Sequence, residues 1–329
     1  MDNFKDISWL DDVVQNWSEG VSLGRQPHAV LITGPTGVGK RAFATWLARQ
    51  HLGIAGTGMP QFPVAPLEHA DLRWIRPPDD KQAIRIDQIR ELVAAMSMTS
   101  YEGRGKVAVL DPADAMTNSA ANSLLKTLEE PSGNALLVLI ADRKGRLPAT
   151  IFSRCQRIEI AVPPEADALR WLDQLRPGNQ WPQALLHAGR APLAALDTLE
   201  QLDAHAAMSR DFSAVASGAS SPLEVAARWQ KLDTAFVLDW LARAVQGAIV
   251  RASEGGKMGA TAEISDSVLK RMDRRNLFCY LDTINRLRGQ PGGSFNVQLT
   301  LEGLLIDLAD GLRDSGGGSP GGEPAELMV

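Results

Sequence analysis

The chain has 329 residues, of which 44% are hydrophobic and 22% are charged, and its formal net charge is −5. This length and composition are typical of a soluble globular protein with two or three domains. The acidic balance argues against a protein wrapped in nucleic acid through bulk charge, although it leaves room for a local basic surface.

Cysteine usage and hydropathy exclude several further classes. Two cysteines, Cys155 and Cys279, are too few for a disulfide framework or a four-cysteine zinc site, and they fit a reducing cytosol. No basic segment followed by an apolar one opens the chain, so no signal peptide is predicted. The longest apolar run, residues 135–141, is too short to cross a bilayer. We therefore expect a cytoplasmic protein without a membrane partner.

The first predicted element with a chemical meaning is a Gly-rich turn between a strand and a helix. An apolar run at residues 29–32 predicts a buried strand, and a helical pattern follows the turn. Such turns bind phosphate because backbone N–H groups and the helix N-terminus converge on the anion, while a lysine adds positive charge. The predicted nucleotide-binding residues of the turn are Gly34, Pro35, Thr36, Gly37, Val38, Gly39, Lys40 and Arg41.

Two positions depart from the motif of an ATP-hydrolysing loop. The motif requires a hydroxyl after the lysine to hold Mg²⁺, but Arg41 stands there, and a guanidinium cannot bind a cation. A second apolar strand ends in Asp111, the position that holds the magnesium water shell, and Pro112 follows it where a glutamate often polarises water. Asp111 can equally begin a turn before the proline. We expect an impaired Mg²⁺ site, passive binding of ATP or ADP at most, and no required cofactor.

Strands and helices alternate along the first half of the chain. Further strands are predicted at residues 71–75, 135–141 and 157–162, with helices between them. Asp142 lies at the end of the second of these strands, and the Gly- and Pro-rich residues 53–66 are predicted to form a loop. This alternation predicts an α/β fold with a parallel sheet that binds its ligand at the carboxyl ends of the strands. Beyond Pro163 only helical patterns follow, and one helix is expected to begin at Pro192, since proline suits the first helical position. Four amphipathic stretches between residues 222 and 312 predict an all-α bundle.

Two later motifs, together with the loop, resemble the bacterial clamp-loader family of AAA+ proteins. One is the helix motif Asn122-Ser123-Leu124-Leu125-Lys126-Thr127-Leu128-Glu129-Glu130-Pro131, whose polar side carries Asn122 and Lys126. The other is Ser153-Arg154-Cys155. The resemblance is strongest between residues 27 and 155.

The resemblance implies a domain order. It implies an AAA+ nucleotide-binding-like domain over residues 1–162, a small helical lid over 163–206 and a helical collar for oligomerisation over 207–314. The Gly- and Ser-rich residues 315–329 are predicted to form a flexible tail. Many relatives hold zinc after the first helix, but residues 53–66 contain no cysteine, so no zinc is expected.

The resemblance also implies a role in trans. In this family the arginine of the Ser-Arg-Cys motif reaches the ATP of a neighbouring subunit, and here it corresponds to Arg154, with Ser153, Asn122 and Lys126 at the interface. The family works as a hetero-pentamer that loads a sliding clamp on primed DNA. Active relatives also have a lid arginine that touches their own nucleotide, and the nearest position here is Leu193. We expect a stator-like subunit that is not catalytic alone.

Two alternatives remain open on sequence grounds. The chain could be a self-sufficient AAA+ ATPase, such as a motor subunit or a helicase-like remodeller, if Mg²⁺ binds despite Arg41. It could also bind DNA without ATP coupling, through cationic residues that otherwise belong to ordinary solvated surface. These are Arg85, Arg90, Arg104 and Lys106.

Overall fold

The structure is a computed structural model that describes residues 4–54, 58–78, 83–131, 133–142, 147–253, 274–289 and 295–311. Two compact units divide the chain, Met1–Leu199 and Glu200–Val329. The predicted tail, residues 315–329, lies outside the described residues. None of the described helices combines the length and the apolar character that a membrane span requires.

A five-stranded parallel sheet organises the first unit, with its strands in the order β4-β5-β6-β2-β7. Every residue of the neighbouring inner strands β2 and β6 is buried, which explains their continuous apolar sequence. The strands of this sheet are β2 (Ala29–Thr33), β4 (Leu72–Ile75), β5 (Lys106–Leu110), β6 (Ala135–Ala141) and β7 (Gln156–Glu159).

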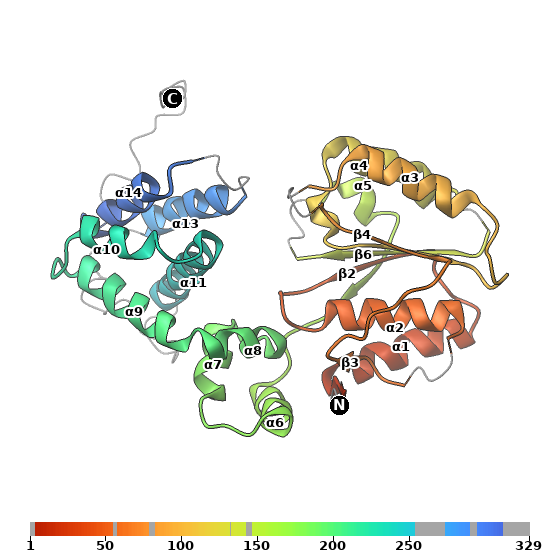
Figure 1. The fold of residues 1–329 in the computed structure, drawn as a ribbon, viewed down its shortest axis with the longest axis horizontal. Coiled ribbons are helices and arrows are strands. Elements are labelled where there is room, and N and C mark those ends of the chain that lie inside the picture. The colour runs from red at the N-terminus through yellow and green to blue at the C-terminus, as the bar shows by residue number, and fades with distance from the viewer. Residues whose placement is uncertain are drawn as a thin grey trace. The chain divides into compact units, whose positions relative to one another are not determined.

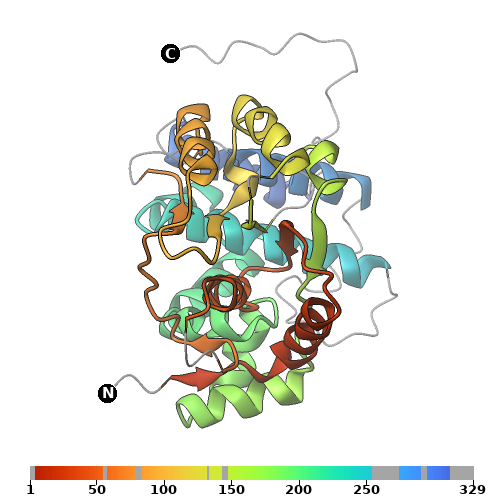
Figure 2. The ribbon, with the colours of Figure 1, turned by 90° about the vertical axis from the view of Figure 1, so that its right-hand side faces the viewer.

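Helices cover both faces of this sheet (Figure 1). The helices α3 (Ile86–Ser97) and α4 (Asn118–Glu129) lie side by side on one face, as Figures 1 and 2 show. Their apolar residues share one buried cluster with alternate strand residues such as Leu31 and Leu137. The helices α1 (Asp11–Ser22) and α2 (Lys40–Leu52) lie on the other face.

The first unit contains further short elements around the sheet. A two-residue strand, β3 (Gln61–Phe62), pairs antiparallel with β1 (Lys5–Asp6), whereas the sequence predicted only a loop at residues 53–66. Two residues of each strand leave too short a pattern to find in the sequence. The remaining elements are the short helices Ser8–Leu10 and Ala113–Ala115, α5 (Ala149–Phe152), α6 (Glu165–Leu175), α7 (Trp181–His187) and α8 (Pro192–Glu200).

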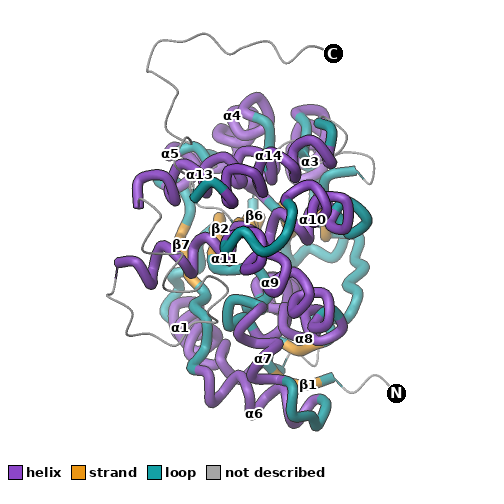
Figure 3. The backbone as a smooth tube through the Cα atoms, turned by 90° about the vertical axis from the view of Figure 1, so that its left-hand side faces the viewer, coloured by secondary structure: helices purple, strands orange, loops and turns teal. Residues whose placement is uncertain are grey.

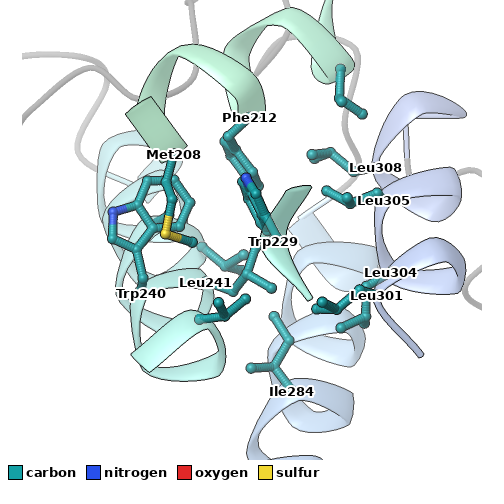
Figure 4. Packing of buried hydrophobic residues seen from close by; sticks show 14 of the residues in the cluster. Met208, Phe212, Trp229, Trp240, Leu241, Ile284, Leu301, Leu304, Leu305 and Leu308 are labelled. Carbon is teal, nitrogen blue, oxygen red and sulfur yellow. The ribbon is translucent and has the colours of Figure 1, made fainter. Parts of the chain in front are cut away.

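The described part of the second unit consists of helices and loops (Figure 3). Its core gathers large aromatic and leucine side chains, with Phe212 and Trp229 each packed edge-on against Trp240 (Figure 4). The buried Tyr280 hydroxyl donates a hydrogen bond to the Leu304 carbonyl at 2.7 Å. The helices are α9 (Leu202–Ala216), α10 (Pro222–Trp229), α11 (Thr234–Ser253), α13 (Arg274–Arg288) and α14 (Val297–Ala309).

The predicted fold class, α/β followed by all-α, is confirmed. The strand expected at residues 157–162 is the edge strand β7, which ends at Glu159. The helix expected to begin at Pro192 is α8, which does begin there.

Candidate functional site

The Gly-rich loop (residues 34–39) joins the carboxyl end of β2 to the first turn of α2. Gly34 has φ +148°, and a Cβ there would lie 2.2 Å from the Ile160 carbonyl oxygen. Gly37 has φ +86°, and a Cβ there would lie 2.5 Å from the Cβ of Ala194 in α8. Both positions combine a backbone conformation that favours glycine with a contact that excludes a side chain. The loop is therefore closely packed between the sheet and α8.

Lys40, the lysine of the predicted motif, is buried and holds three acceptors. Its Nζ donates to the carbonyl oxygens of Gly34 at 2.7 Å and Pro35 at 2.6 Å. It also forms an ion pair with Asp142 Oδ1 at 2.6 Å. An ammonium group has three N–H donors, so this arrangement occupies all of them.

Arg41 and Asp111 form an ion pair at the position where the motif would place Mg²⁺. Arg41 Nε lies 2.8 Å from Asp111 Oδ2, and Arg76 Nε approaches the same oxygen at 3.2 Å. Trp74 Nε1 donates to it as well, at 3.2 Å. The Asp111 side chain is 2% exposed, so a single buried oxygen receives three donors. This carboxylate is engaged by protein cations rather than presented to a metal ion.

A pocket of about 790 Å³ opens beside the loop and is built entirely from the first unit. This volume is in the range of sites that hold small ligands. Its wall includes apolar residues from positions 62–67, and α8 contributes Leu193 and Asp197. The Leu193 backbone N–H donates to the Gly37 carbonyl at 2.9 Å, which fastens the start of α8 to the loop. Leu193, the position predicted to replace a nucleotide-contacting arginine, therefore does line the pocket.

The predicted trans residue, Arg154, lies on the other side of the same unit. Its Nε donates to Glu129 Oε1 at 2.7 Å, its Nη2 contacts the same oxygen, and its Nη1 donates to the Thr150 carbonyl at 3.1 Å. The side chains of Arg154 and Glu129 are 32% and 50% exposed. Burial raises the pKa of the adjacent Cys155 thiol to about 12, so no thiolate competes for the guanidinium near neutral pH.

The strand register separates Arg154 from its own Gly-rich loop. Val30 in β2 is level with Gln156 in β7, and the two strands are parallel. Arg154 therefore precedes β7 at the amino edge of the sheet, whereas Gly34 follows β2 at the carboxyl edge. Six residues of strand correspond to roughly 20 Å, which an arginine side chain cannot span.

The other predicted interface residues lie near Arg154. Ser153 is exposed and accepts a hydrogen bond from Arg154 Nη1 at 3.1 Å. Asn122 and Lys126 are exposed one turn apart on α4, which ends at Glu129. The structure thus places these residues along one exposed face of α4 and at its end.

Several residues of these two clusters were missed by sequence reasoning. Asp142 was noticed only as the residue after a strand, and Glu129 only as part of a motif. Parallel pairing of Thr33 with Ala141 brings the ends of β2 and β6 together, and that neighbourhood is the signal that could have linked Asp142 to Lys40. Nothing in the sequence indicated that Arg76 and Trp74 would share Asp111.

Three of the four cations suggested for direct DNA binding are engaged within the chain. Lys106 Nζ donates to the Ala95 carbonyl at 2.6 Å, Arg104 Nη1 donates to the Gly53 carbonyl at 3.1 Å, and Arg90 lies 3.7 Å from Asp87. Within the described ranges, no group of three or more histidine, cysteine or acidic side chains is placed to hold a metal ion.

The fold and the loop define the class: a parallel α/β region with a Gly-rich loop after its strand β2, followed by an all-α region. Residues 9–164 match a protein family described as DNA polymerase III, delta subunit. A delta-prime subunit of DNA polymerase III from Pseudomonas aeruginosa is 38% identical over 189 residues, which cover 54% of this chain and 58% of that protein. A delta-prime subunit from Haemophilus influenzae is 28% identical, covering 92% of this chain and 95% of that protein.

The chain is thus similar to delta-prime subunits of bacterial DNA polymerase III, and the resemblance indicated by its motifs is confirmed. Among solved structures, a gamma subunit-related protein of DNA polymerase III from Thermotoga maritima has 20% identity and a TM-score of 0.47, over 94% of this chain and 100% of that one. That likeness adds nothing to the sequence matches.

Proposed function

We propose that this chain is a delta-prime-like subunit of the DNA polymerase III clamp loader. It acts in the cytoplasm within a hetero-pentamer of clamp-loader subunits, which opens a sliding clamp and loads it on primed DNA. In this assembly it is a stator-like subunit with little or no ATP hydrolysis of its own. The names of the relatives support the assignment to DNA polymerase III.

The absence of hydrolysis is supported by the contacts of Asp111. Phosphoryl transfer in P-loop proteins relies on a metal ion bound beside the loop hydroxyl and this aspartate. Here Arg41 replaces the hydroxyl, and its guanidinium pairs with the aspartate at 2.8 Å. Any ATP or ADP in the pocket is therefore held passively, without a competent Mg²⁺ site. No zinc participates in this proposal.

The single observation on which the trans role depends is the position of Arg154. It lies at the edge of the sheet away from its own loop, partly exposed, in a pair with a half-exposed glutamate. A planar guanidinium that is always charged is suited to stabilising the charge that develops during phosphoryl transfer. Docking of a neighbour's triphosphate replaces Glu129 as the partner of Arg154, while Ser153, Asn122 and Lys126 contribute to the interface.

The test is Arg154→Ala in the clamp loader reconstituted with its own partner subunits. Assembly is expected to remain intact, and hydrolysis at the ATP site that Arg154 serves is expected to fall by about 10³-fold or more, as for other arginine fingers. The steady-state rate of DNA-stimulated ATP hydrolysis by the complex is then expected to fall to the rate of the remaining ATP sites. Arg154→Lys should rescue little, because an ammonium lacks the planar fork.

Arg157→Ala is the matched control, because Arg157 is an exposed arginine three residues further along. It should leave the rate unchanged. An intact Arg154→Ala complex with the wild-type rate would overturn the trans role. Hydrolysis of ATP by the purified chain alone, with Mg²⁺ and at a motor-like rate, would instead establish a self-sufficient ATPase.

A further inference from the structure

The pocket beside the Gly-rich loop is electrically self-balanced. It is lined by three cations and three carboxylates, so its formal charge is zero; these residues are Lys40, Arg41, Arg76, Asp111, Asp142 and Asp197. A site for a polyphosphate gains affinity from uncompensated positive charge. The distribution of the three carboxylates therefore decides what the pocket can bind.

Asp142 is placed at the loop by the sheet itself. It follows β6, whose last residue, Ala141, pairs with Thr33, the residue before Gly34. Its backbone N–H donates to Asp114 Oδ1 at 3.1 Å, which anchors the backbone at this position. The side chain then reaches Lys40 Nζ at 2.6 Å. The Asp142 carboxylate is thus already paired with Lys40, the lysine that would otherwise bind a phosphate.

The three acceptors of Lys40 differ in how easily they can leave. The carbonyl groups of Gly34 and Pro35 belong to the loop, whose backbone is held by close contacts at Gly34 and Gly37. The Asp142 side chain is 38% exposed, so water can solvate its carboxylate once it leaves the lysine. Asp142 is therefore the acceptor that an incoming phosphate oxygen would replace.

We propose that Asp142 is an internal competitor for phosphate, so that a nucleoside diphosphate or triphosphate binds this pocket only by displacing Asp142 from Lys40. The carboxylate mimics a phosphate oxygen: both are anionic acceptors of a charge-assisted hydrogen bond from the same ammonium group. Arg41 and Arg76 already neutralise Asp111, so this binding requires no divalent cation. The chain thus keeps a phosphate site that is closed by its own side chain.

The test is calorimetric titration of the full-length chain with ADP and ATP, each with and without Mg²⁺. Asp142→Asn keeps the size and polarity of the side chain but removes its charge. The variant is expected to bind ADP about tenfold or more tightly than wild type, because the ammonium exchanges a neutral acceptor rather than an anion. Mg²⁺ is expected to change the affinity of the variant for ADP by less than about twofold.

Asp197→Asn is the matched control, since it removes the same charge from the same pocket at a residue that Lys40 does not contact. The gain in ADP affinity of Asp197→Asn over wild type is expected to be much smaller than that of Asp142→Asn. A second variant, Asp142→Ser, should reproduce the gain, and Lys40→Met introduced into either variant should abolish it. Unchanged ADP affinity in both Asp142 variants, or an equal gain in Asp197→Asn, would overturn the proposal. The titration needs no partner subunit, so its outcome is independent of the trans role of Arg154.

Discussion

The pocket at the carboxyl edge of the sheet and the Arg154 cluster at its amino edge both pair cations with carboxylates. They differ in exposure. In the pocket, Lys40 is 6% and Asp111 is 2% exposed, although Arg41 and Arg76, which pair with Asp111, are 60% and 56% exposed. In the other cluster, Arg154 is 32% and Glu129 is 50% exposed.

This difference in exposure decides which groups are available to a partner. Removing one member of a buried, hydrogen-bonded pair leaves a desolvated group without its partner, which is costly. A pair at the surface exchanges its members for water and contributes about 0–1 kcal/mol. A ligand that replaces a partner of Lys40 or Asp111 must therefore offset the loss of a buried contact, whereas Arg154 can change partners at little cost.

The largest expected effect concerns the loop on which the pocket depends. Gly34→Ala should lower the free energy of unfolding by about 3 kcal/mol or more, because its Cβ would meet the Ile160 carbonyl and its φ is unfavourable. Urea unfolding followed by circular dichroism measures this change. Gly24→Ala is the control, since Gly24 has φ +71° with no atom within 4 Å of the added Cβ, and should cost about 1–2 kcal/mol. Equal losses for the two variants would show that the loop is not closely packed.

A smaller effect is expected at the buried carboxylate. Asp111→Ala removes the shared acceptor of Arg41, Arg76 and Trp74, and should lower the free energy of unfolding by about 1–3 kcal/mol. The loss stays moderate because the two arginines are more than half exposed and can be solvated. The midpoint of urea unfolding reports it. Glu91→Ala, at an exposed position of α3, is the control and should change the free energy of unfolding by less than about 0.5 kcal/mol. If Asp111→Ala unfolded at the wild-type urea concentration, the buried contacts of the pocket would contribute no more to stability than the surface pair does.

The smallest effect is expected at the surface pair. Glu129→Gln should change the free energy of unfolding by less than about 1 kcal/mol, and the difference from wild type should shrink further at high salt, since exposed pairs are screened. Thermal unfolding at low and high ionic strength measures both. A loss above about 2 kcal/mol would mean that Arg154 is held in its own subunit and is not free to change partners.

The sequence allowed the alternation of strands and helices along the chain and the Gly-rich turn to be predicted, because both depend on neighbours along the chain. Buried strands such as β2 and β6 are apolar throughout, and the motif around Lys40 has a fixed spacing. Arg41 pairs directly with Asp111, and the impaired metal site expected there remains a prediction. The predicted domain boundaries and the tail remain predictions.

The contacts that define the two clusters could not be predicted in the same way. Glu129 and Arg154 are 25 residues apart, and Lys40 and Asp142 are separated by several strands and helices. Only the strand order of the sheet brings their backbones together. The short strands β1 and β3 could not be predicted either, because two residues are too few to show the alternation of apolar and polar residues that marks a strand.

Arg154 and the pocket lie at opposite edges of the sheet, so the first unit presents two different faces. Molecules that donate a group on one face and accept one on another associate head to tail, in rows that close into rings or stay open. In this chain the groups beside the Gly-rich loop are already paired with one another, Lys40 with Asp142 and Arg41 with Asp111. The pocket therefore requires no arginine from a neighbouring molecule. Under the trans role proposed for Arg154, the chain can therefore stand at one end of such a row, because it supplies an arginine to its neighbour and needs none at its own pocket.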